Sequence, residues 1–168
     1  MAAPLLDPRD LDFMLYELFD VESMTSRERY SDHNRETFDA AINTSRVVAE
    51  KYFLPIRQKV DTNQPTFDGE KVHMIPEIKV ALDAVVEAGL AAPGADYKLG
   101  GMQLPAPVAA VSGAYLNAAA STTMGYVALT NANANLIAAH GTPEQKNKWL
   151  EPLLNGRFAG TMAMSEPG

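Results

Sequence analysis

The stretch TPEQKNKWLEPLLNGRFAGTMAMSEPG, residues 142–168, decides the fold that the sequence predicts. Its first half is typical of a capped amphipathic helix: Thr142 can cap the amino terminus, Pro143 suits the first helical position, and Gln145 can complete a capping box. Apolar residues then recur at helical spacing as far as Gly156, a natural stop. The apolar, mostly uncharged run over residues 158–164 predicts a β-strand that enters a sheet.

A turn signal, Ser165-Glu166-Pro167-Gly168, follows this strand. Because the sequence opens a strand and then ends, we expect residues 157–168 to be the start of a truncated β-domain. Function therefore has to be inferred separately for a longer parent protein and for this chain.

The region between residues 99 and 143 contains no Asp, Glu, Lys or Arg. A solvent-exposed helix normally has a charged face, so this run predicts either a membrane insertion or helices that are buried on most sides. Polar residues such as Gln103, Asn117 and Thr122 leave no window of about 20 predominantly apolar residues, which argues against a membrane span. We therefore expect two buried helices, over residues 107–120 and 121–139, that the rest of the parent protein or a ligand covers.

The sequence of the remaining chain predicts further helices, which are separated by segments rich in turn-forming residues. Asp7-Pro8-Arg9-Asp10 is a helix start, and residues 34–53 and 76–87 each place apolar side chains on one face. Pro55 is expected to disturb or end the helix before it. Connections are predicted over residues 21–31, 61–69 and 91–104. The sequence thus predicts an all-α fold, a bundle of five or six helices, with the first strand of a truncated β-domain at its C-terminal end.

Composition and charge argue against several functional classes. The chain has 168 residues, a net charge of −7 and no cysteine. A negative charge without a Lys/Arg cluster argues against nucleic-acid binding, and the lack of cysteine excludes disulfides and thiolate chemistry. Acidic residues come too early at the amino terminus for a signal peptide, so we expect a cytoplasmic protein with no membrane partner.

Few residues indicate chemistry by themselves. The motifs of a nucleophile elbow, a P-loop and a dinucleotide-binding turn do not occur. His33, His73 and His140 lie far apart in the sequence, whereas a metal site needs at least a close pair, so we expect no metal site.

Several motifs together resemble the acyl-CoA dehydrogenase family. In that family, a helix beginning G-T-x-E-Q-K leads through a glycine turn into the first strand of the middle domain, which ends in a T-E-P-x-A-G-S-D loop under the flavin. This chain has G-T-P-E-Q-K at residues 141–146 and A-M-S-E-P-G at residues 163–168. F-D-G at residues 67–69 and E-A-G-L at residues 87–90 are similar to the longer bacterial branch, which includes enzymes similar to 3-methylmercaptopropionyl-CoA dehydrogenase.

The resemblance implies three regions in this chain. Residues 1–35 would be an N-terminal extension and residues 36–156 the helical N-terminal acyl-CoA dehydrogenase domain. Residues 157–168 would be the start of the truncated middle β-domain.

The resemblance also assigns cofactor contacts at the end of the predicted strand. It implies that Met162, Met164 and Ser165 meet the pyrimidine side of the FAD ring, with Ser165 in the place of the family's usual Thr. A hydroxyl donor there would stabilise the negative charge that collects when the ring accepts hydride. From the residues alone, Ser165 is only a turn residue.

Two groups of residues on the charge-free helices leave alternatives open. Because alternating residues do not share a helix face, at least one of Asn131, Asn133 and Asn135 should be buried and hydrogen-bonded. We favour a hydrogen-bonded core role over a ligand contact for these asparagines. Three larger side chains can line an acyl pocket, although an ordinary core role is commoner: Tyr115, Met124 and Tyr126.

The parent protein that the resemblance implies is an FAD-dependent acyl-CoA dehydrogenase. It would dehydrogenate an acyl-CoA thioester between the α- and β-carbons, pass electrons to an electron-transfer flavoprotein, and form a homo-oligomer. The family's carboxylate base lies in the C-terminal domain, so this chain alone is expected to be inactive and no catalytic residue is assigned in it. The alternatives are an acyl-CoA oxidase-like flavoenzyme and a non-catalytic helical interaction module.

Overall fold

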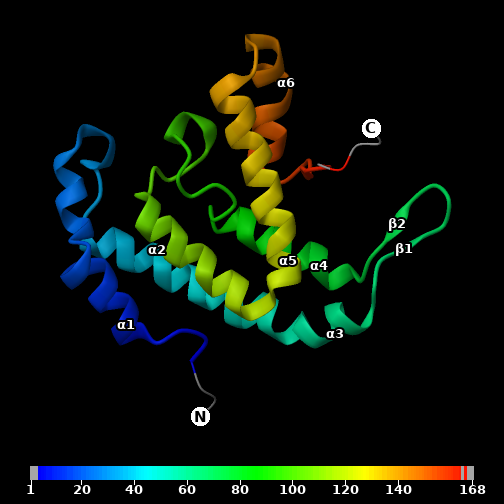
Figure 1. Ribbon diagram of the computed structural model, residues 1–168, viewed down its shortest axis with the longest axis horizontal. Helices are drawn as coiled ribbons and strands as arrows, with labels where there is room; N and C mark the ends of the chain where they lie inside the picture. The colour runs from blue at the N-terminus through cyan, green and yellow to red at the C-terminus, as the bar shows by residue number, and fades with distance from the viewer. Residues whose placement is uncertain (1–3, 164, 166–168) are drawn as a thin grey trace.

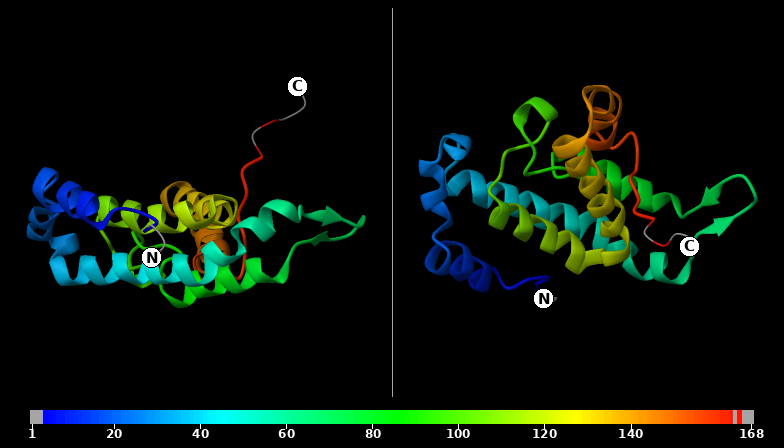
Figure 2. Two further views of the ribbon diagram at one scale, coloured as in Figure 1. Left: turned by 90° about the horizontal axis from the view of Figure 1, so that it is seen from below. Right: turned by 45° about the horizontal axis from the view of Figure 1, so that its top comes forward.

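The computed structural model describes residues 4–163 and Ser165. Helices dominate this part of the chain, and its strands form a single two-stranded hairpin. Figures 1 and 2 show α2 (Arg35–Val48) and α4 (Pro76–Glu87) in one layer, with the long α5 (Ala106–His140) crossing them. The last helix, α6 (Pro143–Leu154), packs against α5. The predicted all-α bundle is confirmed.

The N-terminal segment packs against the body of the bundle. It consists of α1 (Pro8–Asp12), a π-helical turn (Phe13–Leu18) and two 3-10 helices (Val21–Ser26 and Glu28–Tyr30). Asp7 caps α1 as the sequence predicts, but the polar connection predicted for residues 21–31 is wrong. Leu15 and Val21 are buried in one cluster with Phe38, so tertiary packing stabilises structure that the local sequence does not indicate.

The helix α2 begins where the sequence predicts a helix start, after Asn34, and further helical turns follow its last residue. Asn34 Oδ1 accepts a hydrogen bond from the Thr37 backbone N–H at 3.0 Å, and Thr37 Oγ1 accepts one from the Asn34 N–H at 3.0 Å. Pro55 disturbs the helical path, as predicted, without reversing it. The elements that follow α2 are a π-helical turn (Ala49–Phe53), a 3-10 turn (Leu54–Ile56) and α3 (Arg57–Thr62).

A small hairpin replaces part of the loop that the sequence predicts before α4. Its strands, β1 (Thr66–Phe67) and β2 (Val72–His73), are antiparallel, with Phe67 opposite Val72. The hairpin projects from the body of the protein (Figure 1). The helix α4 has the bounds that the sequence predicts, because Pro76 suits a first helical position and Gly89, with φ of 72°, ends the turn after it.

The long helix α5 consists of two halves. Ala120 has φ of −158° and ψ of 88°, so the helical backbone breaks there, at the predicted boundary between two charge-free helices. Leu116 and Ala119 in the first half are buried in the main core. The second half is more exposed than predicted, since 60% of Leu136 is accessible. Among the described residues, no helix combines the length and apolarity that a membrane crossing requires.

The capped helix at residues 142–154 is confirmed, whereas the strand after it is not. Thr142 Oγ1 accepts from the Gln145 N–H at 3.2 Å, and Gln145 Oε1 accepts from the Thr142 N–H at 2.8 Å. Residues 158–163 form no strand in the described chain, and Met164 lies outside the described residues. A strand requires a backbone ladder, and the contacts of this segment run instead to side chains of α5.

Candidate functional site

The segment after α6 is fastened to the second half of α5. The Gly160 N–H donates to Thr130 Oγ1 at 2.9 Å, and Asn133 Nδ2 donates to the Thr161 carbonyl at 2.9 Å. Thr130 in turn donates to the Tyr126 carbonyl at 2.7 Å, which fixes its hydroxyl orientation. Both backbone polar groups of the segment are therefore satisfied by α5 side chains, which direct its path away from the bundle (Figure 2).

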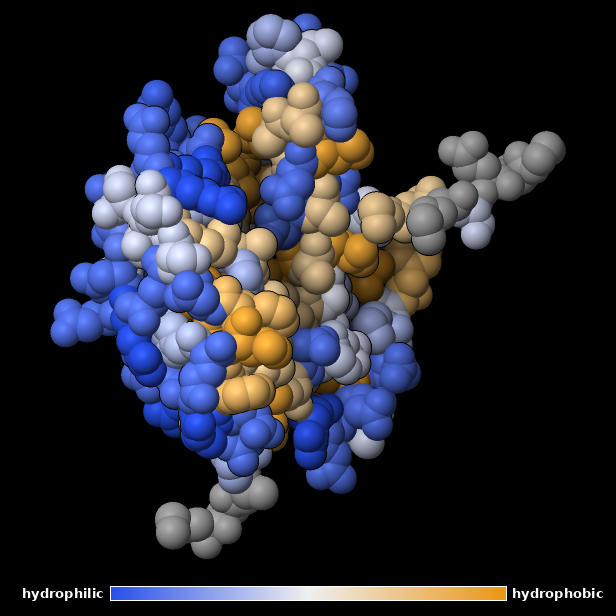
Figure 3. Space-filling view, turned by 60° about the vertical axis from the view of Figure 1, so that its left-hand side comes forward, coloured by the Kyte–Doolittle hydropathy of each residue, from blue (hydrophilic) through white to orange (hydrophobic). Residues whose placement is uncertain are grey.

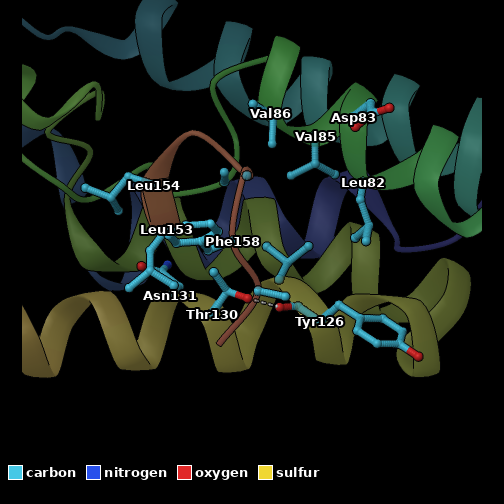
Figure 4. A pocket seen from close by; sticks show the side chains of 14 residues that line it. Leu82, Asp83, Val85, Val86, Tyr126, Thr130, Asn131, Leu153, Leu154 and Phe158 are labelled. Atoms are coloured by element: carbon cyan, nitrogen blue, oxygen red, sulfur yellow. Dashed lines mark hydrogen bonds between the residues drawn. The ribbon is translucent and has the colours of Figure 1, made fainter. Parts of the chain in front are cut away.

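An aromatic contact holds the start of the same segment. The Phe158 ring lies 5.8 Å from the Trp149 ring, centroid to centroid, and the Phe158 N–H donates to the Pro152 carbonyl at 2.8 Å. Phe158 also lines a cavity of about 70 Å³ with Val86 from α4 and Thr130 from α5 (Figure 4). The segment is thus fixed against three helices before it leaves the bundle.

Two glycines permit this close approach. Gly156 has φ of +74°, and a Cβ there would lie 2.5 Å from Val86 Cγ2. A Cβ on Gly160 would lie 2.8 Å from Asn133 Nδ2 and 2.9 Å from Asn133 Cβ. The sequence predicts Gly156 as a helix stop, but nothing in it indicates that Gly160 must fit against an asparagine of another helix.

The predicted flavin contacts lie beyond these fastening points. Met162 is 54% exposed, and Ser165 is exposed as well. No hydrogen bond to another described residue occupies the Ser165 hydroxyl, and Met164 lies outside the described residues. The structure thus presents Met162 and Ser165 on one exposed segment. Sequence reasoning missed Thr130 and Asn133 as its supports, because a helix sequence does not show which distant segment packs on it.

The second half of α5 also carries an exposed, uncharged face beside the segment. Residues at spacings of three, four and seven share a helix face. The face comprises Gly125, Ala128, Leu129, Ala132 and Leu136, and all but half-buried Gly125 are exposed. An uncharged helix face in contact with water indicates a surface that an apolar ligand or another part of the protein covers.

A cavity of about 470 Å³ adjoins this face at Ala128. Its floor is formed by small residues of the first half of α5, among them Gly113, and it includes Met124 and Ser112. Ser112 is 2% exposed, and its Oγ has no hydrogen-bond partner among the described residues. Figure 3, on the side of the N-terminal segment, shows apolar surface between hydrophilic stretches.

The three asparagines differ from expectation. Asn131 and Asn133 are only half-buried and Asn135 is exposed, so the predicted buried asparagine is wrong. Asn133 is hydrogen-bonded, to the carbonyls of Leu129 and Thr161. The second half of α5 is therefore covered less completely than the lack of charge suggests.

The three larger side chains have different surroundings. Tyr115 is 3% exposed in the main core, and this burial raises the pKa of its phenol. Met124 packs against that core and lines the 470 Å³ cavity. Tyr126 donates to Met74 Sδ at 3.0 Å.

The histidines occupy separate places. His33 Nε2 lies 2.9 Å from the Met102 carbonyl oxygen, and His73 Nε2 lies 2.6 Å from Asp68 Oδ2 in the hairpin. His140 is at the end of α5. Within the described residues, no three His, Cys, Asp or Glu side chains are grouped as a metal site would require.

The described chain is thus a helical bundle whose last helix, α6, leads into a segment that is hydrogen-bonded to α5. The family model for the acyl-CoA dehydrogenase N-terminal domain matches residues 35–157. The chain therefore belongs to the acyl-CoA dehydrogenase family and contains its N-terminal domain.

Curated relatives agree with this membership. The 3-methylmercaptopropionyl-CoA dehydrogenase of Ruegeria pomeroyi is 26% identical over 159 residues, which cover 95% of this chain and 27% of the relative. The broad-specificity linear acyl-CoA dehydrogenase FadE5 of Mycobacterium tuberculosis is 31% identical over 167 residues, covering 95% of this chain and 26% of the relative. The human mitochondrial short-chain specific acyl-CoA dehydrogenase is 30% identical over 135 residues, covering 79% of this chain and 30% of the relative. The chain thus spans little more than a quarter of the length of these relatives.

Proposed function

We propose that this chain is the N-terminal part of an FAD-dependent acyl-CoA dehydrogenase. The observation that carries the proposal is the fastening of the segment with Met162 and Ser165 beside the exposed, uncharged face of α5. The segment with the proposed cofactor contacts and the surface proposed for an apolar chain then adjoin the same helix, α5. The substrate is an acyl-CoA thioester, in agreement with the names of the relatives.

The residues present fit a flavin ring. Ser165 offers an exposed hydroxyl that no described residue engages, and Met162 offers a flexible, polarisable side chain for packing against a ring. FAD, when bound, supplies the acceptor for the β-hydride. Ser165 would then donate a hydrogen bond where negative charge collects on the bound ring, and the contacts of Gly160 and Thr161 with α5 would hold the preceding part of the segment in place.

The acyl group is expected to lie along the uncharged face of α5. Ala128 and Ala132 present only methyl groups, so the face can approach an alkyl chain closely, and burial of both surfaces is favourable. The catalytic base belongs to another part of the parent protein, so this chain alone is expected to be inactive. We propose an electron-transfer flavoprotein as electron acceptor and a homo-oligomer as the assembled form.

The test is Ser165→Ala in the full-length enzyme. Removal of one preorganised donor to developing charge is expected to slow flavin reduction by about 10- to 100-fold, because backbone donors remain. Rapid-mixing absorbance with acyl-CoA measures this rate, and Ser165→Thr is the control that keeps the hydroxyl. An unchanged rate in Ser165→Ala would contradict the role of Ser165. A full-length protein that binds no flavin would contradict the proposed function itself.

A further inference from the structure

The N-terminal segment supplies a wall of the 470 Å³ cavity. Arg29 and Tyr30, from the second 3-10 helix, line it together with small residues of α5. Both residues lie outside the part of the chain that matches the family domain, which begins at residue 35. The cavity is therefore completed by a segment that the matched domain does not include.

Arg29 fastens this segment to the loop over residues 91–104. Its Nη1 pairs with Asp96 Oδ1, and its Nη2 donates to the Gly94 carbonyl at 3.1 Å. In the reverse direction, Gln103 Nε2 donates to the Arg29 carbonyl at 3.0 Å. The hydrogen bond that Arg29 donates to the Asp96 carboxylate raises the pKa of Arg29, so this guanidinium stays charged. One residue thus makes three contacts with a single loop.

The loop over residues 91–104 is held together by contacts between its own residues, so it can shift as a unit. The Gln103 N–H donates to the Ala95 carbonyl at 3.0 Å, and the Leu104 N–H donates to the Pro93 carbonyl at 2.9 Å. Gly101 packs so closely on Ala95 that a Cβ there would lie 2.1 Å from its carbonyl oxygen. Since the loop is internally tied, the position of its cavity-lining residues follows from the position of the whole loop.

The lining of the cavity leaves room for an apolar occupant. Small side chains such as Ala109 and Ala110, together with Gly113, form much of it. Ser112 Oγ, in the same lining, is buried without a hydrogen-bond partner among the described residues. An alkyl chain offers this hydroxyl no partner, so a water in the cavity is needed to relieve the cost of its burial.

We propose that the ion pair between Arg29 and Asp96, here called the latch, holds the N-terminal segment in place as the end wall of the acyl site. This wall limits the length of the acyl chain that the site accepts. The proposal rests on the proposed function, because it takes the occupant of the cavity to be the distal end of the acyl group. Arg29 is a positioning residue: it holds the wall and the loop, and takes no part in the reaction. Opening the latch enlarges the cavity and admits longer chains.

The experiment compares Arg29→Gln with Arg27→Gln in the full-length enzyme. Arg27 lies in the same segment, is exposed, and makes no ion pair with a described residue, so it is the matched control. Hydrogen exchange of residues 91–104 should be about two- to fivefold faster in Arg29→Gln, the range expected for an exposed ion pair. Values of kcat/KM along a straight-chain series from butyryl-CoA to palmitoyl-CoA should shift towards longer chains in Arg29→Gln only.

A charge exchange separates the latch from a general loss of stability. Arg29→Asp combined with Asp96→Arg should restore slow exchange in the loop and return the chain-length profile towards that of the parent enzyme. Faster exchange with an unchanged chain-length profile would overturn the length limit, and unchanged exchange would overturn the latch. A full-length enzyme without activity on any acyl-CoA would instead overturn the proposed function, while the exchange comparison would still decide whether the latch exists.

Discussion

Replacement of Gly160 by alanine should detach the segment that carries the proposed flavin contacts. The added Cβ would lie 2.8 Å from Asn133 Nδ2, 2.9 Å from Asn133 Cβ and 3.0 Å from Asn133 Cγ. Rotation of the amide alone does not relieve the contact with Asn133 Cβ, because that atom is fixed to the backbone of α5. The segment must therefore move.

The size of the effect follows from the contacts that such a movement breaks. It separates the Gly160 N–H from Thr130 Oγ1 and the Thr161 carbonyl from Asn133 Nδ2. Each is a neutral hydrogen bond, with a net contribution of about 1 kcal/mol. The position of the segment against α5 should therefore be less stable by about 2 kcal/mol. This corresponds to a detached population that is larger by about 30-fold.

Limited trypsin digestion at Arg157 measures that population. Arg157 is exposed, and the residues after it must leave α5 to enter a protease. The appearance of the fragment that ends at Arg157, followed by mass spectrometry, should be about 30-fold faster in Gly160→Ala. Trp149, the sole tryptophan of the chain, gives a second readout, since its fluorescence should change when Phe158 leaves its ring.

Gly125→Ala is the matched control. A Cβ at Gly125 meets no atom within 4 Å, and alanine in a helix interior is favoured over glycine by about 1 kcal/mol. This variant should therefore be more stable to heat and should show unchanged cleavage at Arg157. Equal cleavage rates in Gly160→Ala and the parent chain would refute the reasoning that Gly160 is required for close packing.

Two further predictions concern the ends of helices and the hairpin. Asn34→Ala and Thr142→Ala each remove half of a capping box and should lower the free energy of unfolding by about 1 kcal/mol in thermal melts. Glycine at either position should lower it by only about a few tenths of a kcal/mol. Equal losses for alanine and glycine would contradict the capping role. The hydrogen bond from His73, helped by the backbone N–H groups of Lys71 and Glu70, lowers the pKa of Asp68 to about 2. The stabilising contact in the hairpin is therefore fully present above the ordinary carboxyl pKa, and it is lost as the pH falls through about 2. An NMR titration should show this low pKa and its rise in His73→Ala, and an ordinary pKa in the parent chain would contradict the contact.

The elements that the sequence predicts best are those with local signals. The capping box at Thr142 and the bounds of α4 are confirmed because side chains a few residues apart determine them, whereas the capping box at Asn34 was not predicted although the helix start was. The division of the charge-free run into two helices at residue 120 is also confirmed, by the non-helical backbone of Ala120. The predicted strand over residues 158–164 is not observed in the described residues, because a strand depends on partners elsewhere in a protein.

For the candidate site, the sequence by itself determined the type of residue and the tertiary structure decided the arrangement. The motif at residues 163–168 indicated the family and made Ser165 a candidate for a cofactor contact. The types of residue in a motif can be recognised from the sequence without knowledge of the fold. Only the folded chain placed Gly160 against Asn133 and Arg29 against Asp96. The helix α6 lies between Asn133 and Gly160 in the chain, and several elements lie between Arg29 and Asp96. Contacts of that kind arise from packing, and local spacing in a single sequence does not specify which surfaces will meet.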